Sequence, residues 1–360
     1  MTRASGTCPP EAIARVKASI AARAGLDLPD WVLASRLEQR LGALDHPDAM
    51  AYAELVSSDA GAQELELLLE ALRVGETRFF RHAAHVKALT DVVIPALRAA
   101  RPRGTVRAWS AGCASGEEPY TLAMVLRKLL PRPAYNVSVL ATDLSAEAIE
   151  VARAGEYPAT ALAQVPEAWR SWAFLPAAAD AAGHERWRIH DAIGELVSFE
   201  RANLADGEFR RGFDIIWCRN VLIYFSREAR QRVIAGLIDS LSDDGFLFVG
   251  YAESLRDFAE AEAVRTPDAV LYRKARATES SPPAQQPTTS PRGPARPRAA
   301  APIGNVTGPV IAEEAVLELR GRYDGDRLGA ELAHVVSGRY RSVAIDLDGA
   351  QYLADDAGPV

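Results

Sequence analysis

Cysteine is scarce in this sequence: 360 residues contain only Cys8, Cys113 and Cys218, and no two of them form a C-x-x-C pair. This spacing argues against a disulfide framework and a zinc finger, and it is typical of a reducing compartment. The six histidines show no metal-ligand spacing, and the one close pair, His82 and His85, is interpreted as part of a helix surface. We therefore expect no metal site, and we interpret Cys113 and Cys218 as small buried residues rather than nucleophiles.

Long apolar runs and an excess of positive charge are also missing. No run approaches the roughly 18–20 residues that span a membrane, and the N-terminus lacks the continuous apolar stretch of a signal peptide. Lys and Arg number 41 and Asp and Glu 48, which gives a formal net charge of −7. We therefore expect a cytoplasmic protein that does not bind nucleic acid by neutralising phosphates.

One segment has a composition that cannot form a packed core. Residues 276–309 hold eight of the 22 prolines, four arginines and one acidic residue, and no aromatic residue. Such a segment buries too little apolar surface to offset the entropy of ordering it. We predict a Pro-rich disordered linker that divides the chain into a body, 1–275, and a tail, 310–360.

The first part of the body, residues 1–88, is predicted to be an all-α N-terminal domain. Apolar residues follow helical spacing in three stretches, and Ser58 or Asp59 is expected to cap the approach to the third. The apolar residues are Ile13, Val16 and Ile20; Leu33, Leu37, Leu41 and Leu44; and Leu65, Leu68, Leu69 and Leu72.

From residue 89 to residue 275, short β-branched or aromatic runs alternate with helical stretches. The strand-like runs are 105–112, 136–145, 213–220 and 244–251, and the helical stretches are 85–100, 116–130, 145–154 and 227–241. This alternation predicts an α/β fold with a parallel sheet covered by helices on both faces. A last strand over 269–274 follows too closely for another crossover helix, so we expect it to be antiparallel.

The alternation breaks between about residues 156 and 196. This stretch contains three of the six tryptophans, Trp169, Trp172 and Trp187. We predict an insertion with a small fold of its own, after which residues 197–204 resume the sheet.

Ligands of open α/β sheets bind at the carboxyl ends of the strands, and the first of these ends carries a glycine loop. Gly112 and Gly116 let the backbone approach a ligand, while Glu117 and Glu118 with Pro119 suit the first turn of a helix. Two carboxylates would repel a pyrophosphate, and no P-loop lysine follows. A cationic or neutral nucleoside is therefore favoured, and a nicotinamide dehydrogenase is disfavoured.

The second strand end carries Asp143, where an acidic residue commonly accepts hydrogen bonds from ribose hydroxyls. The alternative is that Asp143 caps the helix that begins near Ser145. After the third strand, Asn203 is a candidate for the adenine edge. After the fourth, Asn220 is a candidate for an amino-acid end of the ligand, and core packing is favoured for Phe225.

Together these stretches resemble the CheR family of chemotaxis receptor methyltransferases. The motifs that carry the resemblance stand in order along residues 1–275: GETRFFR, WSAGCASGEEPYTLAM, ATDLSAEAIEVARAGEY, Asn203-Leu204, FDIIWCRNVLIYF and DGFLFVGYAESL. The resemblance implies a Rossmann-like sheet that binds S-adenosyl-L-methionine, with S-adenosyl-L-homocysteine as product. It also implies a protein-glutamate O-methyltransferase that makes γ-methyl esters on the cytoplasmic helices of methyl-accepting chemotaxis receptors.

The resemblance also implies site residues. Cofactor contacts are expected from Gly75, Thr77, Arg81, Gly112, Glu117, Asp143, Asn203, Leu204, Asn220 and Val221, and orientation of the acceptor carboxylate from Arg98, Arg219 and Tyr224. One position departs from the family, which usually has Asn where this chain has Gly75. Either cofactor binding is weakened there or a backbone group replaces the side chain.

The acceptor chemistry agrees with a site that contains no catalytic histidine. A glutamate with a pKa of about 4.3 is already ionised at neutral pH, so no general base is required. Catalysis then consists of positioning and exclusion of water.

The resemblance identifies the insertion with a small β-subdomain, which in some members docks a receptor tether through a glycine-rich turn. The corresponding stretch here has a single glycine, Gly183, so we expect a tether-independent enzyme. Residues 1–88 contain ten basic and twelve acidic residues. Only a local patch, with Arg15, Arg36 and Arg40 as candidates, is therefore expected to attract an acidic receptor helix.

The tail, residues 310–360, resembles a partial STAS domain. Strand-like runs surround a helical stretch at 326–336, but the place of the phosphorylatable serine reads Ala354-Asp355-Asp356-Ala357-Gly358. A protein-interaction module is favoured over a phosphoregulated switch. The alternative function for the whole chain is an adaptor that binds cofactor weakly and scaffolds signalling proteins through this tail.

Overall fold

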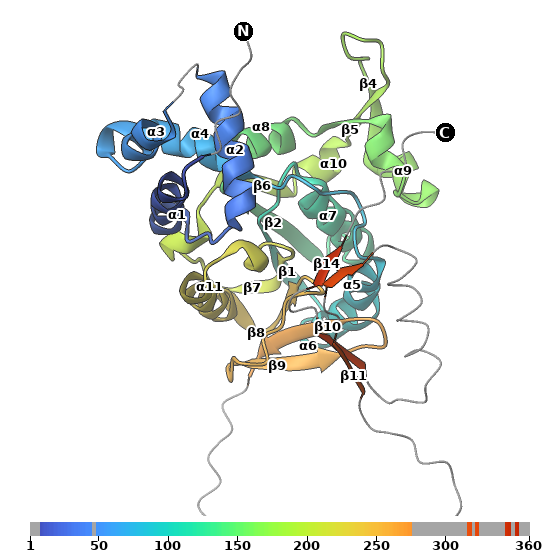
Figure 1. Cartoon of the computed structure of the whole chain (residues 1–360). Helices are drawn as coiled ribbons and strands as arrows, with labels where there is room; N and C mark the ends of the chain where they lie inside the picture. The colour runs from blue at the N-terminus through green and yellow to red at the C-terminus, as the bar shows by residue number, and fades with distance from the viewer. Residues whose placement is uncertain are drawn as a thin grey trace, which may run out of the picture. The chain divides into compact units, whose positions relative to one another are not determined.

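The computed structural model describes residues 8–44 and 48–275, together with four short strands of the tail (Figure 1). The chain separates into two compact units, Met1–Pro282 and Pro283–Val360. The predicted linker, 276–309, lies outside the described residues. Within the described part, no helix combines the length and apolarity needed to cross a membrane.

The first unit begins with a helical unit built on amphipathic helices. Its helices are α1 (Pro10–Ala24), α2 (Asp30–Ala43), α3 (Ala49–Val56), the single turn η1 (Asp59–Gly61) and α4 (Ala62–Leu72). The predicted apolar faces meet in one core that includes Val16, Ile20, Leu37 and Leu68. These residues lose nearly all contact with water, which stabilises the unit by the hydrophobic effect.

Three details of the helical unit differ from the sequence prediction. Helix α3 was not predicted, because its eight residues are too few for a clear apolar period. Leu44 is exposed, since α2 ends at Ala43 before the apolar face completes another turn. Neither Ser58 nor Asp59 caps α4, which follows Gly61 with no side-chain cap.

The rest of the first unit is built around a seven-stranded sheet with the order β6-β2-β1-β7-β8-β10-β9. Its strands are β1 (Gly104–Ala111), β2 (Tyr135–Asp143), β6 (Val197–Arg201), β7 (Phe213–Cys218), β8 (Leu241–Val249), β9 (Ala261–Arg265) and β10 (Val270–Lys274). The pairs β1/β2, β1/β7, β2/β6 and β7/β8 are parallel. This arrangement confirms the predicted α/β fold.

The antiparallel orientation predicted for the last strand is confirmed, because β10 pairs antiparallel with β8. It also pairs antiparallel with β9, a strand that was not predicted. The sequence of β9, AEAVR, has too few apolar residues to be recognised as a strand, and most of its residues are exposed or half-buried.

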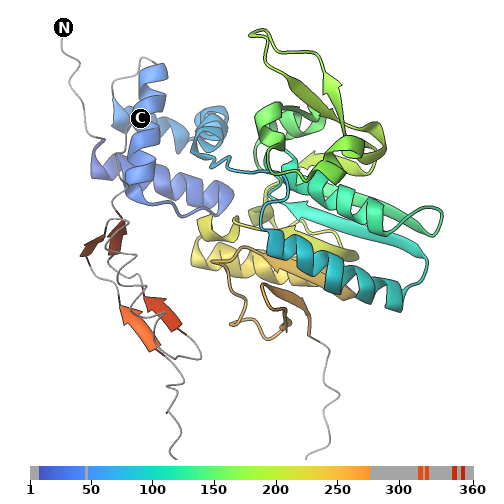
Figure 2. The same cartoon turned by 90° about the vertical axis from the view of Figure 1, so that its right-hand side faces the viewer.

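Helices cover both faces of this sheet, as Figures 1 and 2 show. They are α5 (Ala83–Ala88), η2 (Leu89–Val93), α6 (Ile94–Ala100), α7 (Glu117–Leu129), α8 (Ala146–Ala154) and α11 (Arg227–Ser240), while the single turns η4 (Leu204–Asp206) and η5 (Leu222–Tyr224) follow β6 and β7. α5 runs into η2 and α6 without a break, so residue 88, the predicted boundary of the N-terminal domain, lies inside a helical stretch.

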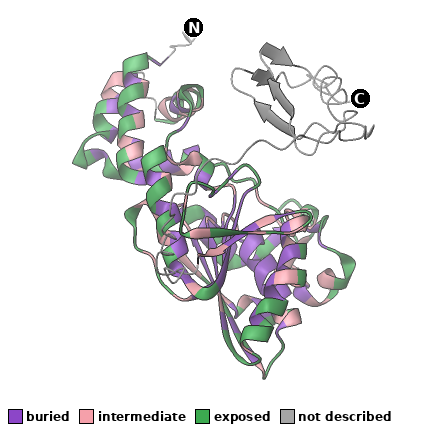
Figure 3. Cartoon of the chain, turned by 90° about the horizontal axis from the view of Figure 1, so that it is seen from below, coloured by how far each residue is buried: buried purple, intermediate pink, exposed green. Residues whose placement is uncertain are grey.

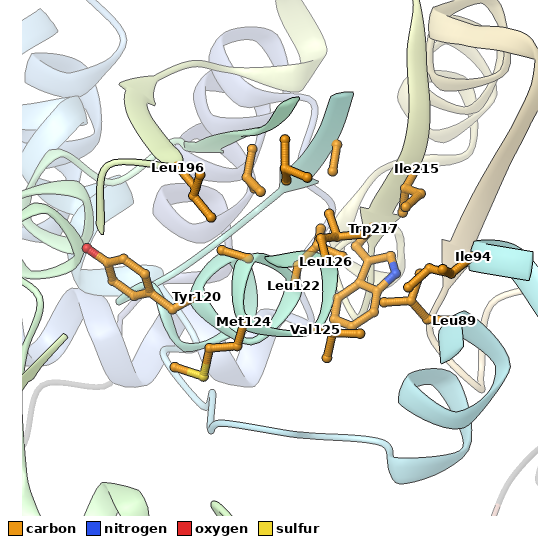
Figure 4. Packing of buried hydrophobic residues seen from close by; sticks show 14 of the residues in the cluster. Leu89, Ile94, Tyr120, Leu122, Met124, Val125, Leu126, Leu196, Ile215 and Trp217 are labelled. Atoms are coloured by element: carbon orange, nitrogen blue, oxygen red, sulfur yellow. The ribbon is translucent and has the colours of Figure 1, made fainter. Parts of the chain in front are cut away.

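Alternate strand residues point to two separate apolar cores, one on each face of the sheet. Ile215 and Trp217 belong to the core shared with α7 and α6, whereas Ile216 and Leu247 belong to the core shared with α11. Figure 4 shows the first of these cores, where α7 residues such as Leu122 and Leu126 pack beside Trp217, Leu89 and Ile94. Figure 3 shows the buried strands between helices whose outer surfaces are exposed.

The predicted insertion is a small antiparallel sheet with the order β3-β5-β4. It comprises β3 (Glu156–Pro158), η3 (Ala159–Leu162), α9 (Glu167–Ala173), β4 (Phe174–Ala177), β5 (Arg186–Ile189) and α10 (Asp191–Gly194). Phe79 joins it to the main domain, since its ring makes edge contacts with Tyr157 and Phe174.

The tail contributes two parallel strand pairs to the second unit. β11 (Ala315–Glu318) pairs with β13 (Val343–Asp346), and β12 (Gly321–Tyr323) pairs with β14 (Ala350–Tyr352). The predicted helix at 326–336 and the segment Ala354–Gly358 lie outside the described residues.

Candidate cofactor and methyl-transfer site

A cavity of about 290 Å³ lies at the carboxyl ends of β1, β2 and β7. The chain runs from β1 to β2 on one side and from β7 to β8 on the other, so the cavity occupies the topological switch point where such sheets bind ligands. The predicted site residues that line it are Thr77, Arg81, Gly112, Asp143, Asn203, Leu204, Arg219, Asn220, Val221 and Tyr224. Those that do not are Gly75, Glu117 and Arg98.

The loop after β1 and the loop after β7 touch at Gly112 and Val221. A Cβ atom on Gly112 would lie only 2.4 Å from Val221 Cγ2, and Gly112 has φ +82°. Only glycine meets both conditions without strain. The bare backbone of the glycine loop thus forms part of the cavity wall, as the sequence predicts.

Asp143 ends β2 and holds the glycine loop in place. Its Oδ2 accepts a hydrogen bond from the Ala114 amide at 2.8 Å, and its Oδ1 accepts one from the Ser145 amide at 2.9 Å. Burial raises the pKa of the Asp143 carboxyl, while these two backbone donors act in the opposite direction. The capping alternative is wrong, because Ser145 itself caps α8 by accepting from the Ala148 amide.

Of the two glutamates that start α7, Glu118 faces the cavity and Glu117 does not. Glu118 Oε2 accepts from Arg219 Nε at 2.7 Å, and its Oε1 accepts from the Ser110 hydroxyl at 2.6 Å. The Glu117 carboxylate instead accepts from the Ser115 hydroxyl at 2.8 Å, away from the cavity. Adjacent helical residues point about 100° apart, so the assignment to Glu117 rather than Glu118 is corrected.

Arg219 is fixed by its neighbours on several sides. Besides Glu118, it donates from Nη1 to the Arg81 carbonyl at 2.8 Å, and its guanidinium carbon lies 4.2 Å from the centre of the Trp217 ring. Its side chain is 3% exposed. These contacts suit a residue that positions the Arg81 loop and Glu118.

Residues 73–82 form an irregular segment rather than a helix. Arg81 folds back to donate to the Glu76 carbonyl at 2.8 Å and still lines the cavity. Gly75 lies outside the cavity lining, and a Cβ there would meet Arg73 Nη1 at 3.2 Å. The Arg73 guanidinium therefore occupies the space beside the position at which the family usually has Asn.

Asn203 lines the cavity, but its side chain serves the fold. Its amide nitrogen donates to the Arg23 carbonyl at 2.9 Å and to Asp206 Oδ1 at 2.8 Å. Its amide oxygen accepts from the Ala205 amide at 3.0 Å. These bonds link α1 and η4, and the predicted adenine contact of Asn203 stays a prediction.

The loop after β7 depends on Glu253, a buried residue that the sequence analysis did not select. Its carboxylate accepts from the backbone amides of Asn220 at 3.1 Å, Ile223 at 3.2 Å and Gly250. Asn220 needs this support because it has φ +60°, a strained conformation for a residue with a side chain. Glu253 occurs in the motif DGFLFVGYAESL, and membership of that motif is the sequence signal that could have identified it.

Of the residues predicted to orient the acceptor, Tyr224 lines the cavity and Arg98 does not. The Tyr224 hydroxyl makes no hydrogen bond within the described part of the chain, and burial raises its pKa, so it stays protonated at neutral pH. Arg98 is exposed on α6, which leads into the amino end of β1. The site lies at the opposite, carboxyl edge of the sheet, and Arg98 is therefore corrected to a surface residue.

The histidine pair also differs from its predicted surface position. His85 is 1% exposed and its ring lies against Tyr251 and Phe248, because the face of α5 that carries it points into the domain. Burial lowers the pKa of His82 to about 4 and that of His85 to about 3. Cys113 and Cys218 are buried, as predicted, and burial raises both thiol pKa values.

The cavity wall presents hydrogen-bond acceptors that the described residues do not satisfy. Glu70 Oε2 and Asn220 Oδ1 are buried, line the cavity and have no partner there. Buried acceptors of this kind require donors, which the hydroxyl and ammonium groups of S-adenosylmethionine can supply. The hydrogen-bond acceptors of the cavity wall therefore fit this cofactor.

Comparison with known proteins agrees with this geometry. Residues 75–269 match the family described as CheR methyltransferase, SAM binding domain. The chain is 36% identical to a probable chemotaxis protein methyltransferase of Rhizobium etli, over 61% of this chain and 82% of that relative. It is 34% identical to chemotaxis protein methyltransferase 1 of Pseudomonas aeruginosa (58% and 77%), and 37% identical to the chemotaxis protein methyltransferase of Vibrio parahaemolyticus (57% and 74%). The predicted cofactor class is thereby confirmed, and the chain belongs to the CheR methyltransferase family.

Proposed function

We propose that this protein transfers a methyl group from S-adenosylmethionine to glutamate side chains of methyl-accepting chemotaxis receptors. The observation that carries the proposal is the cavity at the switch point, which gathers ten of the thirteen predicted site residues inside the stretch that matches the family. The three relatives reported above are named as chemotaxis protein methyltransferases.

The residues proposed to hold the cofactor follow the wall of the cavity. Asp143 would accept from the ribose, Leu204 would lie against the adenine, and the loop from Asn220 to Val221 would close over the amino-acid end. Arg81 retains guanidinium N–H groups that can bind the carboxylate of that end. When bound, S-adenosylmethionine supplies an electrophilic methyl group on a sulfonium sulfur.

The protein's own contribution to the reaction is mainly positional. The acceptor carboxylate is ionised at neutral pH, so the chain has no proton to remove. We propose that the free hydroxyl of Tyr224 donates a hydrogen bond to this carboxylate and aims one oxygen at the methyl group. The Arg219 charge is balanced by Glu118, so this arginine would position Arg81 rather than bind the acceptor.

The receptor helix would dock around the mouth of the cavity, where the exposed side chains of Val74 and Ile223 form an apolar rim. The basic patch expected on the helical unit is largely neutralised. Arg15 pairs with Glu54 at 3.1 Å, and Arg40 pairs with Glu64 at 2.6 Å. Apolar contact at the rim is therefore the proposed basis of docking. A cytoplasmic location is proposed as well, because the proposed substrate is the cytoplasmic part of the receptors.

Tether-independent action remains our proposal for the insertion. An added peptide strand would pair with an edge of the small sheet, and the edge strand β4 contains Pro176, which has no amide hydrogen to donate. Calorimetry with the C-terminal peptide of a receptor from the same cell tests this point. We expect no binding, and measurable affinity would contradict the proposal.

The tail is proposed to bind a protein partner, with no part in methyl transfer. The 360-residue chain and the variant truncated after residue 275 are expected to methylate receptors at the same rate. Two measurements distinguish the enzyme from the adaptor alternative. They are the binding of S-adenosylhomocysteine and the transfer of labelled methyl groups to receptor-containing membranes. An enzyme shows both, whereas an adaptor labels no receptor.

A further inference from the structure

We propose that Glu70, at the end of α4 in the helical unit, is a further cofactor-binding residue whose carboxylate accepts a hydrogen bond from a ribose hydroxyl. This inference rests on the proposed function, because it concerns the same cavity. It assigns part of the cofactor site to the helical unit, which lies outside the stretch that matches the family.

The position of the Glu70 carboxylate is fixed at one oxygen and open at the other. Oε1 accepts from the Ala146 amide at 2.7 Å, across the boundary between α4 and the start of α8. Oε2 is buried, lines the cavity and has no partner among the described residues. A buried carboxylate oxygen without a donor is costly, and the missing donor is what a bound ligand would supply.

The neighbours of Glu70 indicate which part of the ligand it meets. Ala146 follows the carboxyl end of β2 by three residues, so Glu70 lies beside Asp143, at the place where such sheets bind ribose. Each Asp143 oxygen already accepts one backbone hydrogen bond. A ribose presents two adjacent hydroxyls, and Asp143 together with Glu70 presents two adjacent acceptors.

No described cation competes for the free oxygen. The other glutamates that line the cavity have arginine partners, which are Arg201 for Glu66, Arg81 for Glu76 and Arg219 for Glu118. Glu70 has no such pair among the described residues. Its charge is therefore available to a donor from the ligand.

The variant Glu70→Gln tests the inference sharply. Its amide oxygen can keep the bond to Ala146, while its amide nitrogen replaces the free acceptor by a donor. The probes are S-adenosylhomocysteine and 5′-methylthioadenosine, which lacks the amino-acid half. We expect calorimetry to show at least about tenfold weaker binding of both probes. The control Glu150→Gln, an exposed glutamate on α8 outside the cavity, should bind both like the wild type.

The outcomes separate the inference from the proposed function. If the wild type and Glu70→Gln bind both probes with the same affinity, the role of Glu70 is overturned and the proposed function still stands. Loss of S-adenosylhomocysteine binding with unchanged methylthioadenosine binding also overturns it, since Glu70 would then meet the amino-acid half. A wild type that binds neither probe contradicts the function and the inference together. Glu70→Asp, which withdraws the carboxylate by one methylene, is the second variant and should show the same loss.

Discussion

Glu118 and Arg219 form a buried ion pair, 2.7 Å between Oε2 and Nε, with side chains only 10% and 3% exposed. Removing one member leaves the other charge buried without a partner, which typically costs about 3–5 kcal/mol. We therefore predict that Glu118→Ala lowers the free energy of unfolding by that amount in urea titrations. The exposed pair Arg210–Glu200 is the control, and Glu200→Ala should cost less than about 1 kcal/mol.

The same pair makes a prediction about additivity. The double variant Glu118→Ala with Arg219→Ala should be less destabilised than the sum of the two single variants, because neither charge is then left alone. Strict additivity in this cycle would show that the two residues do not stabilise each other.

Gly112→Ala is predicted to lose cofactor binding as well as stability. The added methyl would lie 2.4 Å from Val221 Cγ2, and the alanine would have to keep the backbone φ of +82° that Gly112 adopts. Gly183→Ala is a matched control, since Gly183 has φ +84° but nothing within 4 Å of the added carbon. We expect the control to lose about 1 kcal/mol of stability and no affinity for S-adenosylhomocysteine. Equal behaviour of the two variants would disprove the close approach of the two loops.

Tyr224→Phe is predicted to slow methyl transfer without weakening cofactor binding. The lost hydroxyl has no partner within the described residues, so its removal should leave the fold unchanged. The rate of receptor methylation should fall at least about tenfold, as expected for a lost hydrogen bond to a carboxylate, with the same dissociation constant for S-adenosylhomocysteine. Transfer at the wild-type rate would remove Tyr224 from the acceptor site.

Acid is predicted to destabilise the protein through His85. Burial lowers the pKa of His85 in the folded state to about 3, below the usual value of about 6.5. The unfolded chain then binds more protons in the interval between these values, so stability is complete above about pH 6.5 and falls as the pH decreases towards 3. Between pH 6.5 and pH 5 the expected loss is about 2 kcal/mol from this residue.

His85→Phe checks this pH dependence by replacing the buried ring with one that does not titrate. Urea unfolding at the two pH values should show a smaller loss in this variant than in the wild type. His184→Phe, at an exposed position, should retain the wild-type pH dependence. If the free energy of unfolding changes equally with pH in the wild type and in His85→Phe, His85 is not the source of the acid destabilisation.

The main sheet could be predicted from the sequence because its strands and helices have distinct apolar periods. Gly112 and Asp143 could be predicted as site residues because strand ends in this fold converge on one edge. The choice between Glu117 and Glu118 could not, since both precede the same helix and only packing decides which one faces inward. Glu70 was missed because its hydrogen bond to the Ala146 amide joins residues that are 76 apart in the chain, and no local pattern records that contact.

Transfer of labelled methyl groups from S-adenosylmethionine to membrane receptors of the same cell is the most direct test of the central claim. The account predicts label on the receptors that alkali releases as methanol, as expected for a glutamate methyl ester, and a marked loss of that label with Tyr224→Phe. Receptors that stay unlabelled in the presence of folded, cofactor-binding protein, or label that resists alkali, would contradict it.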